Sequence, residues 1–127
     1  MNQRQKLGKL GEKLTLDYLW RQGFSVWGKN IYNAYGEIDI LVSREGILHF
    51  VEVKTLSTMG MMTPQANFTV YKQRRLYLTV LAFIEENNIG YDWQIDFCGI
   101  SVDNKSRCAK LSYTQNVPLD ERVIEEL

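Results

Sequence analysis

The sequence predicts an α/β or α+β fold, with one domain built on a mixed central β-sheet flanked by two main helices. The chain has 127 residues, about the length of one ordinary domain. Two segments have the apolar spacing of amphipathic helices, and several shorter segments are rich in β-branched and aromatic residues. At this length we expect a single core.

The first element is a helix from about Gln3 to Gln22, which Gly23 ends. One side of this helix carries small and apolar residues, and the small ones suit close approach to a sheet. These residues are Gly8, Gly11, Thr15, Tyr18 and Leu19. A short strand is predicted at Phe24–Trp27, whereas Asn30–Tyr35 fits either a loop or a ragged strand.

A β-hairpin follows, with strands at Glu37–Val42 and Ile47–Lys54. If Glu45-Gly46 forms a two-residue turn, the register places Asp39 directly opposite Glu52. A four-residue loop also keeps these two acids on one face, but an unbulged three-residue loop separates them. Alternation along the first strand places three residues on the face of the acids and three on the other face. The first set is Glu37, Asp39 and Leu41, and the second is Ile38, Ile40 and Val42.

The second half begins with a long loop, predicted at Leu56–Phe68, and a helix over Val70–Asn88 whose inner side carries four apolar residues. These are Leu76, Val80, Phe83 and Ile84. Two more strands are predicted at Trp93–Val102 and Cys108–Tyr113. The order is therefore α-β-β-β-α-β-β, and the helix between the third and fourth strands predicts that these two strands are parallel. Residues 1–113 form the expected domain, and residues 114–127 an acidic, loosely held tail.

Composition limits the chemistry. Two cysteines and one histidine exclude zinc sites built from four cysteines, or from two cysteines and two histidines. Carboxylates and lysines are therefore the expected reactive groups. No 18-residue apolar run is present, so we expect a cytoplasmic protein with no membrane partner.

Charge is unevenly placed along the chain, although the total is zero. Residues 1–84 hold 11 basic and 6 acidic side chains, a net of +5, and residues 85–127 hold 4 basic and 9 acidic side chains, a net of −5. This division fits a basic face kept apart from an acidic tail, and it fits equally well a mixed solvated surface.

The acids inside the hairpin are unusual, because like charges directly opposite each other destabilise a sheet. Asp39 and Glu52 supply only oxygen ligands, which suit Mg²⁺ or Mn²⁺. Lys54 projects on the same side, where it can contact a scissile phosphate or an attacking water. Glu12, at the edge of the first helix's inner face, can add a carboxylate. Solvated strand faces or simple ion pairs are the alternative for each of these residues.

Two motifs in the hairpin, Gly36-Glu37-Ile38-Asp39-Ile40 and Phe50-Val51-Glu52-Val53-Lys54-Thr55, resemble the YraN-like family. That family is grouped with the PD-(D/E)xK nucleases and resembles Holliday-junction resolvases. Further matches are Gly8–Glu12 in the first helix, Lys72–Leu76 at the start of the second, and Asp96-Phe97 in the following strand.

The resemblance implies a restriction-endonuclease-like core, with residues 1–113 as the nuclease-like domain. It also implies a metal-dependent endonuclease acting on DNA, with branched or structured DNA as one substrate class. Asp39, Glu52, Glu12 and the main chain at Val53 would bind Mg²⁺ or Mn²⁺, Lys54 would be the catalytic lysine, and Gln73 would lie near the site. By analogy with resolvases, a homodimer is expected.

Basic residues on the two helices form the candidate nucleic-acid surface, because such groups contact phosphates without reading sequence. They are Lys9, Lys13, Lys72, Arg74 and Arg75, with Tyr71 beside them. Ordinary solvated surface is the alternative. Three functions thus stay open: a DNA endonuclease, a catalytically silent nucleic-acid-binding module of the same fold, or an interaction protein whose basic residues are paired by the acidic tail.

Overall fold

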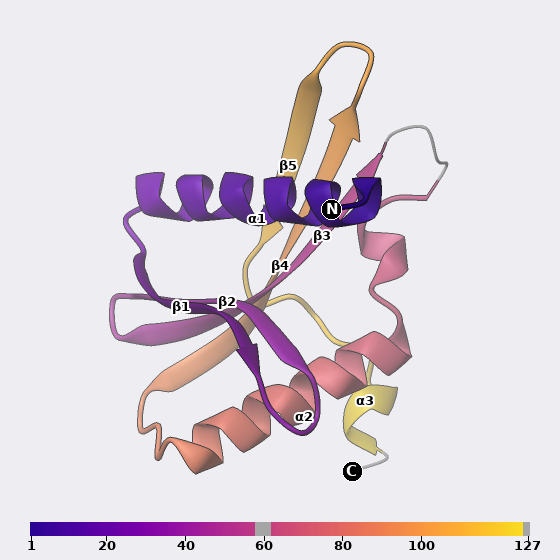
Figure 1. The fold of residues 1–127 in the computed structure, drawn as a ribbon. Helices are drawn as coiled ribbons and strands as arrows, with labels where there is room; N and C mark the ends of the chain where they lie inside the picture. Colours follow the sequence, from indigo (N-terminus) through magenta and orange to yellow (C-terminus); the bar gives the residue numbers. More distant parts are fainter. Residues whose placement is uncertain (58–61, 126–127) are drawn as a thin grey trace.

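The computed structural model describes residues 1–57 and 62–125 and has the predicted α+β architecture. One five-stranded mixed sheet, in the order β1-β2-β3-β4-β5, forms the centre. Two long helices pack against it and the short α3 follows the last strand (Figure 1). Of the helices that the structure describes, none has both the length and the hydrophobicity to cross a bilayer.

Neighbouring strands of the sheet pair in antiparallel fashion, except for the pair β3–β4. β1 (Ser25–Tyr32) lies beside β2 (Glu37–Arg44), and β2 beside β3 (Ile47–Ser57). β4 (Asp92–Asp103) pairs with β5 (Cys108–Thr114). The pair β3–β4 is parallel, which confirms the prediction made from the intervening helix.

Helix α1 (Gln3–Arg21) packs on one face of the sheet through the predicted small residues. Gly11, Thr15 and Leu19 are buried, and the Thr15 hydroxyl donates to the Gly11 carbonyl at 2.8 Å. An Asn2–Gln5 capping box begins the helix. The core on this side joins Leu19 and Phe24 to apolar residues of β2, β3 and β4, namely Ile40, Val42, Val51, Cys98, Ile100 and Val102.

Helix α2 (Val70–Glu86) covers a second core, on the other face of the sheet from α1. The four apolar residues predicted on its inner side all contact this core. Thr69 caps the helix by accepting the Lys72 amide. The buried residues on this side are Ile38, Leu41, Leu48, Phe50, Phe68, Leu76, Val80, Ile95 and Phe97. Figure 1 shows α2 running diagonally below the sheet, away from α1.

The structure decides one alternative that the sequence left open and corrects one predicted loop. The segment Asn30–Tyr35, for which a loop and a ragged strand were both possible, continues β1 as far as Tyr32. The pairing of β1 with β2 has a register shift between Val26 and Gly28. The predicted loop Leu56–Phe68 is wrong at its start, because Leu56 and Ser57 continue β3 against the long β4. A 3₁₀ turn also occupies Gln65–Asn67. Residues 58–61 of that loop lie outside the described residues.

The face predicted for Ile38 is also wrong. Ile38 packs with Leu41 and Phe50 on the α2 side, whereas Ile40 packs on the α1 side. The β2–β3 ladder ends at Ile40–Val51, and beyond it simple alternation no longer describes β2.

The acidic tail is not loosely held in its described part. Val123, in α3 (Arg122–Glu125), is fully buried, and the Asp120 amide donates to the Gln73 side chain at 2.7 Å. The Asn116 amide also donates to the buried Asp96 carboxylate at 2.9 Å. The tail therefore packs against the start of α2. The acidic composition of the tail alone did not indicate this packing.

Candidate metal and phosphate site

The acids of the hairpin meet where the β2–β3 ladder opens. The turn at Glu45-Gly46 pairs Arg44 with Ile47, so the register predicted for a two-residue turn is confirmed. Paired residues extend to Ile40–Val51, and Asp39 and Glu52 come directly after this pair. Beyond this pair the Val53 amide of β3 donates to the Asp39 side chain, at 2.8 Å from Oδ2, and not to a main-chain carbonyl of β2. This bond ties the Asp39 carboxylate to β3 beside Glu52.

Glu52 is the most perturbed acid of this group. Burial raises its pKa well above the usual range, and a hydrogen bond to Asp39 and the charges of Asp39 and Glu37 raise the pKa further. The Asp39–Glu52 pair is therefore stabilised when it holds a proton. A divalent cation can replace that proton and offset the same repulsion.

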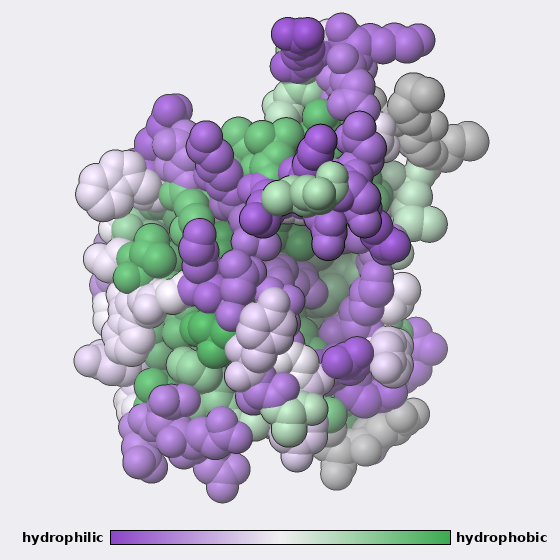
Figure 2. All heavy atoms as spheres, in the orientation of Figure 1, coloured by the Kyte–Doolittle hydropathy of each residue, from purple (hydrophilic) through white to green (hydrophobic). Residues whose placement is uncertain are grey.

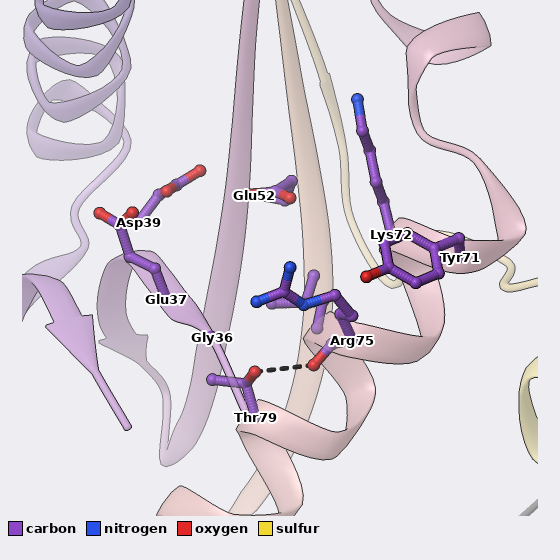
Figure 3. A pocket seen from close by; sticks show the side chains of 9 residues that line it. Gly36, Glu37, Asp39, Glu52, Tyr71, Lys72, Arg75 and Thr79 are labelled. Atoms are coloured by element: carbon purple, nitrogen blue, oxygen red, sulfur yellow. Dashed lines mark hydrogen bonds between the residues drawn. The ribbon is translucent and has the colours of Figure 1, made fainter. Parts of the chain in front are cut away.

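A cavity of about 270 Å³ opens in front of the pair. Its walls come from β2, β3 and α2, with Glu37 and Asp39 on one side and Tyr71, Lys72 and Arg75 on the other (Figure 3). Leu76, Thr79 and Gly36 complete its lining. Hydrophilic residues cover much of the face turned to the viewer in Figure 2, with smaller hydrophobic patches between them.

Two further cavities adjoin this one and share Asp39 with it. One is lined by Glu52, Val53, Lys54 and Lys72, and the other brings Arg4 and Glu12 of α1 to Val53 and Lys54. The structure thus gathers the predicted ligands and the predicted lysine around Asp39. Burial lowers the pKa of Lys54, and the positive charges of Lys72 and Arg4 lower it further.

The donor set fits Mg²⁺ or Mn²⁺ better than a metal held entirely by protein. Among residues 1–57 and 62–125, no three His, Cys, Asp or Glu side chains are arranged to hold one metal ion together. Mg²⁺ commonly uses one or two carboxylates and completes its shell with waters and substrate phosphate. Asp39 and Glu52, with the main chain at Val53, meet that requirement.

Four other predicted residues are not brought to these cavities. Lys9 and Lys13 are exposed on α1, away from the cavity linings. The Arg74 guanidinium donates to the Arg122 carbonyl at 3.0 Å, so Arg74 contacts the tail. Gln73 uses both ends of its amide, donating to the Phe68 carbonyl at 2.8 Å and accepting from Asp120. Gln73 therefore joins the tail to the start of α2.

Two residues that line the cavities, Glu37 and Arg4, were not predicted as site residues from the sequence. Glu37 is half-buried in the cavity, and burial raises its pKa, as does the charge of Asp39. Its position two residues before Asp39 on the same strand face was the available signal. Arg4 was signalled by its helical spacing with Gly8 and Glu12 along one side of α1.

Comparison with known proteins agrees with this arrangement of motifs. The model of the family described as Uncharacterised protein family UPF0102 matches residues 11–102, which contain every hairpin residue discussed above. The chain belongs to the UPF0102 family. This family is a member of the PD-(D/E)xK-like nuclease superfamily, and the mixed sheet with its helices is consistent with a restriction-endonuclease-like core.

Relatives in the UPF0102 family come from several bacteria. A UPF0102 protein of Campylobacter hominis is 30% identical over 114 residues, covering 90% of this chain and 95% of that protein. A UPF0102 protein of Coxiella burnetii is 35% identical over 103 residues, covering 80% and 86%. One from a Sulfurihydrogenibium species is 38% identical over 97 residues, covering 76% and 84%. The names of these relatives state membership of the UPF0102 family and do not state an activity.

Proposed function

We propose that this protein is a metal-dependent endonuclease that hydrolyses phosphodiester bonds in DNA, with branched or structured DNA among its substrates. The observation that carries the proposal is the Asp39–Glu52 pair, two carboxyls held together at the open end of a strand pair with Lys54 beside them. Partly buried acids that repel each other cost stability unless they bind a cation or a proton.

Each residue has a role that follows from its place. Asp39 and Glu52 would hold Mg²⁺ or Mn²⁺, with the main chain at Val53 and the carboxylate of Glu12 nearby. When bound, the ion would supply Lewis-acid charge to the scissile phosphate. Lys54 contacts the phosphate or orients the attacking water, and the lowered pKa of Lys54 eases proton transfer.

Substrate phosphates on either side of the scissile bond would contact Lys72 and Arg75, which face the cavity from α2. Lys72 also donates to the Asn67 side chain, and Arg75 donates to the Tyr35 carbonyl at 3.1 Å. Among the ion pairs of the described residues, none links Lys72 or Arg75 to the acidic tail. This favours nucleic-acid contact over a purely protein-binding role.

The test is cleavage of labelled branched and linear DNA in Mn²⁺ or Mg²⁺. We expect cleavage by the native protein, loss of it in excess chelator, and loss of it in Asp39→Asn and Lys54→Ala. The matched controls are Asp17→Asn, an exposed acid of α1, and Lys110→Ala, an exposed lysine of β5, and both should cleave normally. Activity that survives both site variants contradicts the proposal.

A catalytically silent nucleic-acid-binding module is the second candidate. Lys72 and Arg75 line the cavity and favour it, because such cations hold nucleic-acid phosphates without a metal ion. Calorimetric titration with Mn²⁺ separates the two functions, because the nuclease needs an ion at Asp39 and Glu52. Binding of Mn²⁺ that Glu52→Gln abolishes supports the nuclease, whereas DNA binding without any Mn²⁺ site supports the silent module.

A further inference from the structure

One exposed tyrosine, Tyr71, lines the main cavity, and two more, Tyr32 and Tyr35, are bonded or paired through their main chain to cavity-lining residues. We refer to these three residues as the tyrosine rim. Their exposed fractions are 72%, 50% and 64%. None of the three belongs to either hydrophobic core of the described residues. Their rings are therefore available to a ligand, and the roles proposed above for metal and phosphate do not use them.

The rim stands on both walls of the cavity. Tyr32 ends β1 and is paired with Glu37 of β2, which lines the cavity. Tyr71 lines the cavity from the first turn of α2, on the side away from Glu37 and Asp39 (Figure 3).

Tyr35 lies in the chain segment that joins β1 to β2. Its carbonyl accepts two bonds from the Arg75 guanidinium, at 3.2 and 3.1 Å. These bonds tie the β1–β2 connection to α2. The Arg75 guanidinium also lies 6.0 Å from the centre of the Tyr71 ring. The rings are thus carried on segments that the same arginine holds together.

A ring and two positive charges lie together on the α2 wall of this cavity, with Lys72 next to Tyr71 and Arg75 one turn further on. Cations contact the phosphate backbone, and exposed aromatic rings stack on bases whose faces are uncovered. In a duplex the base faces are stacked on each other, so exposed rings beside a phosphate-binding surface suit unpaired nucleotides. A protein-docking surface, by contrast, is depleted of charge at its centre.

We propose that the tyrosine rim stacks unpaired nucleobases, so that the cavity selects single-stranded nucleic acid or the unpaired part of a structured substrate. This inference rests on the proposed function for the class of ligand, but it concerns binding and not cleavage. Duplex DNA would contact only Lys72, Arg75 and their basic neighbours.

The experiment measures fluorescence anisotropy of a labelled single strand and of a labelled duplex at low salt in excess chelator. Three forms are compared with the native protein. The first replaces all rim tyrosines with alanine, and the second replaces them with phenylalanine, which keeps the rings. The third is Tyr91→Ala, which removes a tyrosine of similar exposure, 52%, packed on Trp27 at the other end of β1.

The native protein should bind the single strand more tightly than the duplex. The alanine form should lose about fivefold or more in single-strand affinity for each ring that stacks. The phenylalanine form and Tyr91→Ala should bind like the native protein, because stacking needs the ring and not the hydroxyl. A salt dependence unchanged in the alanine form would show that phosphate contacts remain.

Equal single-strand affinity in the alanine and native forms overturns the inference, as does an equal loss in the phenylalanine form. Self-association that depends on the rim, in a protein that binds no nucleic acid, also overturns it and indicates a protein interface. The chelator separates this test from the test of cleavage. Rim-dependent binding by a protein that cuts no substrate supports the inference while the nuclease proposal fails.

Discussion

The contact of α1 with β3 is tight enough to forbid a methyl group at Gly11. A Cβ added there would lie 1.7 Å from Thr55 Oγ1 and 3.0 Å from Thr55 Cβ. Thr55 is buried, so packing restricts the rotation that would move its Oγ1 out of the first clash, and the second clash adds to it because the strand fixes the Cβ position. Gly11→Ala therefore forces α1 and β3 apart, next to Glu12 and Lys54.

Gly8, one turn earlier on the same helix, provides the matched control. A Cβ at Gly8 meets nothing within 4 Å, so Gly8→Ala should stabilise the protein by about 1 kcal/mol through helix propensity. Gly11→Ala gains the same propensity but adds an overpacking cost of about 1–3 kcal/mol. We therefore expect Gly11→Ala to be less stable than Gly8→Ala by about 1–3 kcal/mol.

Urea unfolding followed by circular dichroism measures the difference directly, since a domain of this size is expected to unfold in two states. Thr55→Ala tests the cause, because it removes the clashing oxygen, which accepts and donates no hydrogen bond among the described residues. The double variant should recover stability relative to Gly11→Ala, with a favourable coupling of about 0.5–3 kcal/mol. Equal stability of the two alanine variants, or additive effects in the double variant, would refute the packing explanation.

Two further predictions concern the buried polar groups of β4. Burial raises the pKa of Asp96, but hydrogen bonds from His49, Tyr113, Asn116 and Gln94 outweigh burial and hold that pKa below its usual range. Asp96→Asn should therefore cost about 1–3 kcal/mol at neutral pH. The stability difference should stay constant above about pH 4 and shrink as the pH falls through the lower native pKa, which urea titrations at several pH values would show. Burial also raises the pKa of the Cys98 thiol to about 11, so only the exposed Cys108 should react with Ellman's reagent before unfolding, and reaction of both thiols in the native state would contradict this.

The pairing of the β2–β3 hairpin could be predicted from the local sequence alone. The Glu45-Gly46 turn set the register, and the alternation of side chains then placed Asp39 and Glu52 together without knowledge of the rest of the molecule. The parallel pairing of β3 and β4 was also predictable, because a helix lies between them in the chain. These features depend on residues close together in the sequence or on the order of the elements along the chain, and both can be read from the sequence.

Other features depended on distant partners. Gln73 resembled a site residue, yet both ends of its amide bind main-chain groups, one of them in the C-terminal tail 47 residues away. The tail appeared loose because its acidic composition hides Val123, which packs fully buried. Ile38 left its predicted face because the ladder with β3 ends before it. For Gln73 and the tail the partners lie far apart along the chain, where periodicity carries no signal.

By itself, the order of residues determined the element types, the hairpin register and the two acids and lysine that meet at its open end, because turns and alternating strands obey short-range rules. Only the packed molecule decided which cations face those acids. It brought Arg4 from α1 and Arg75 from α2 to the same group of cavities, while contacts with the tail drew Gln73 and Arg74 away. The physical reason is that a side chain's charge acts through distance in space, and the distance between two helices is set by how their inner faces fit the sheet.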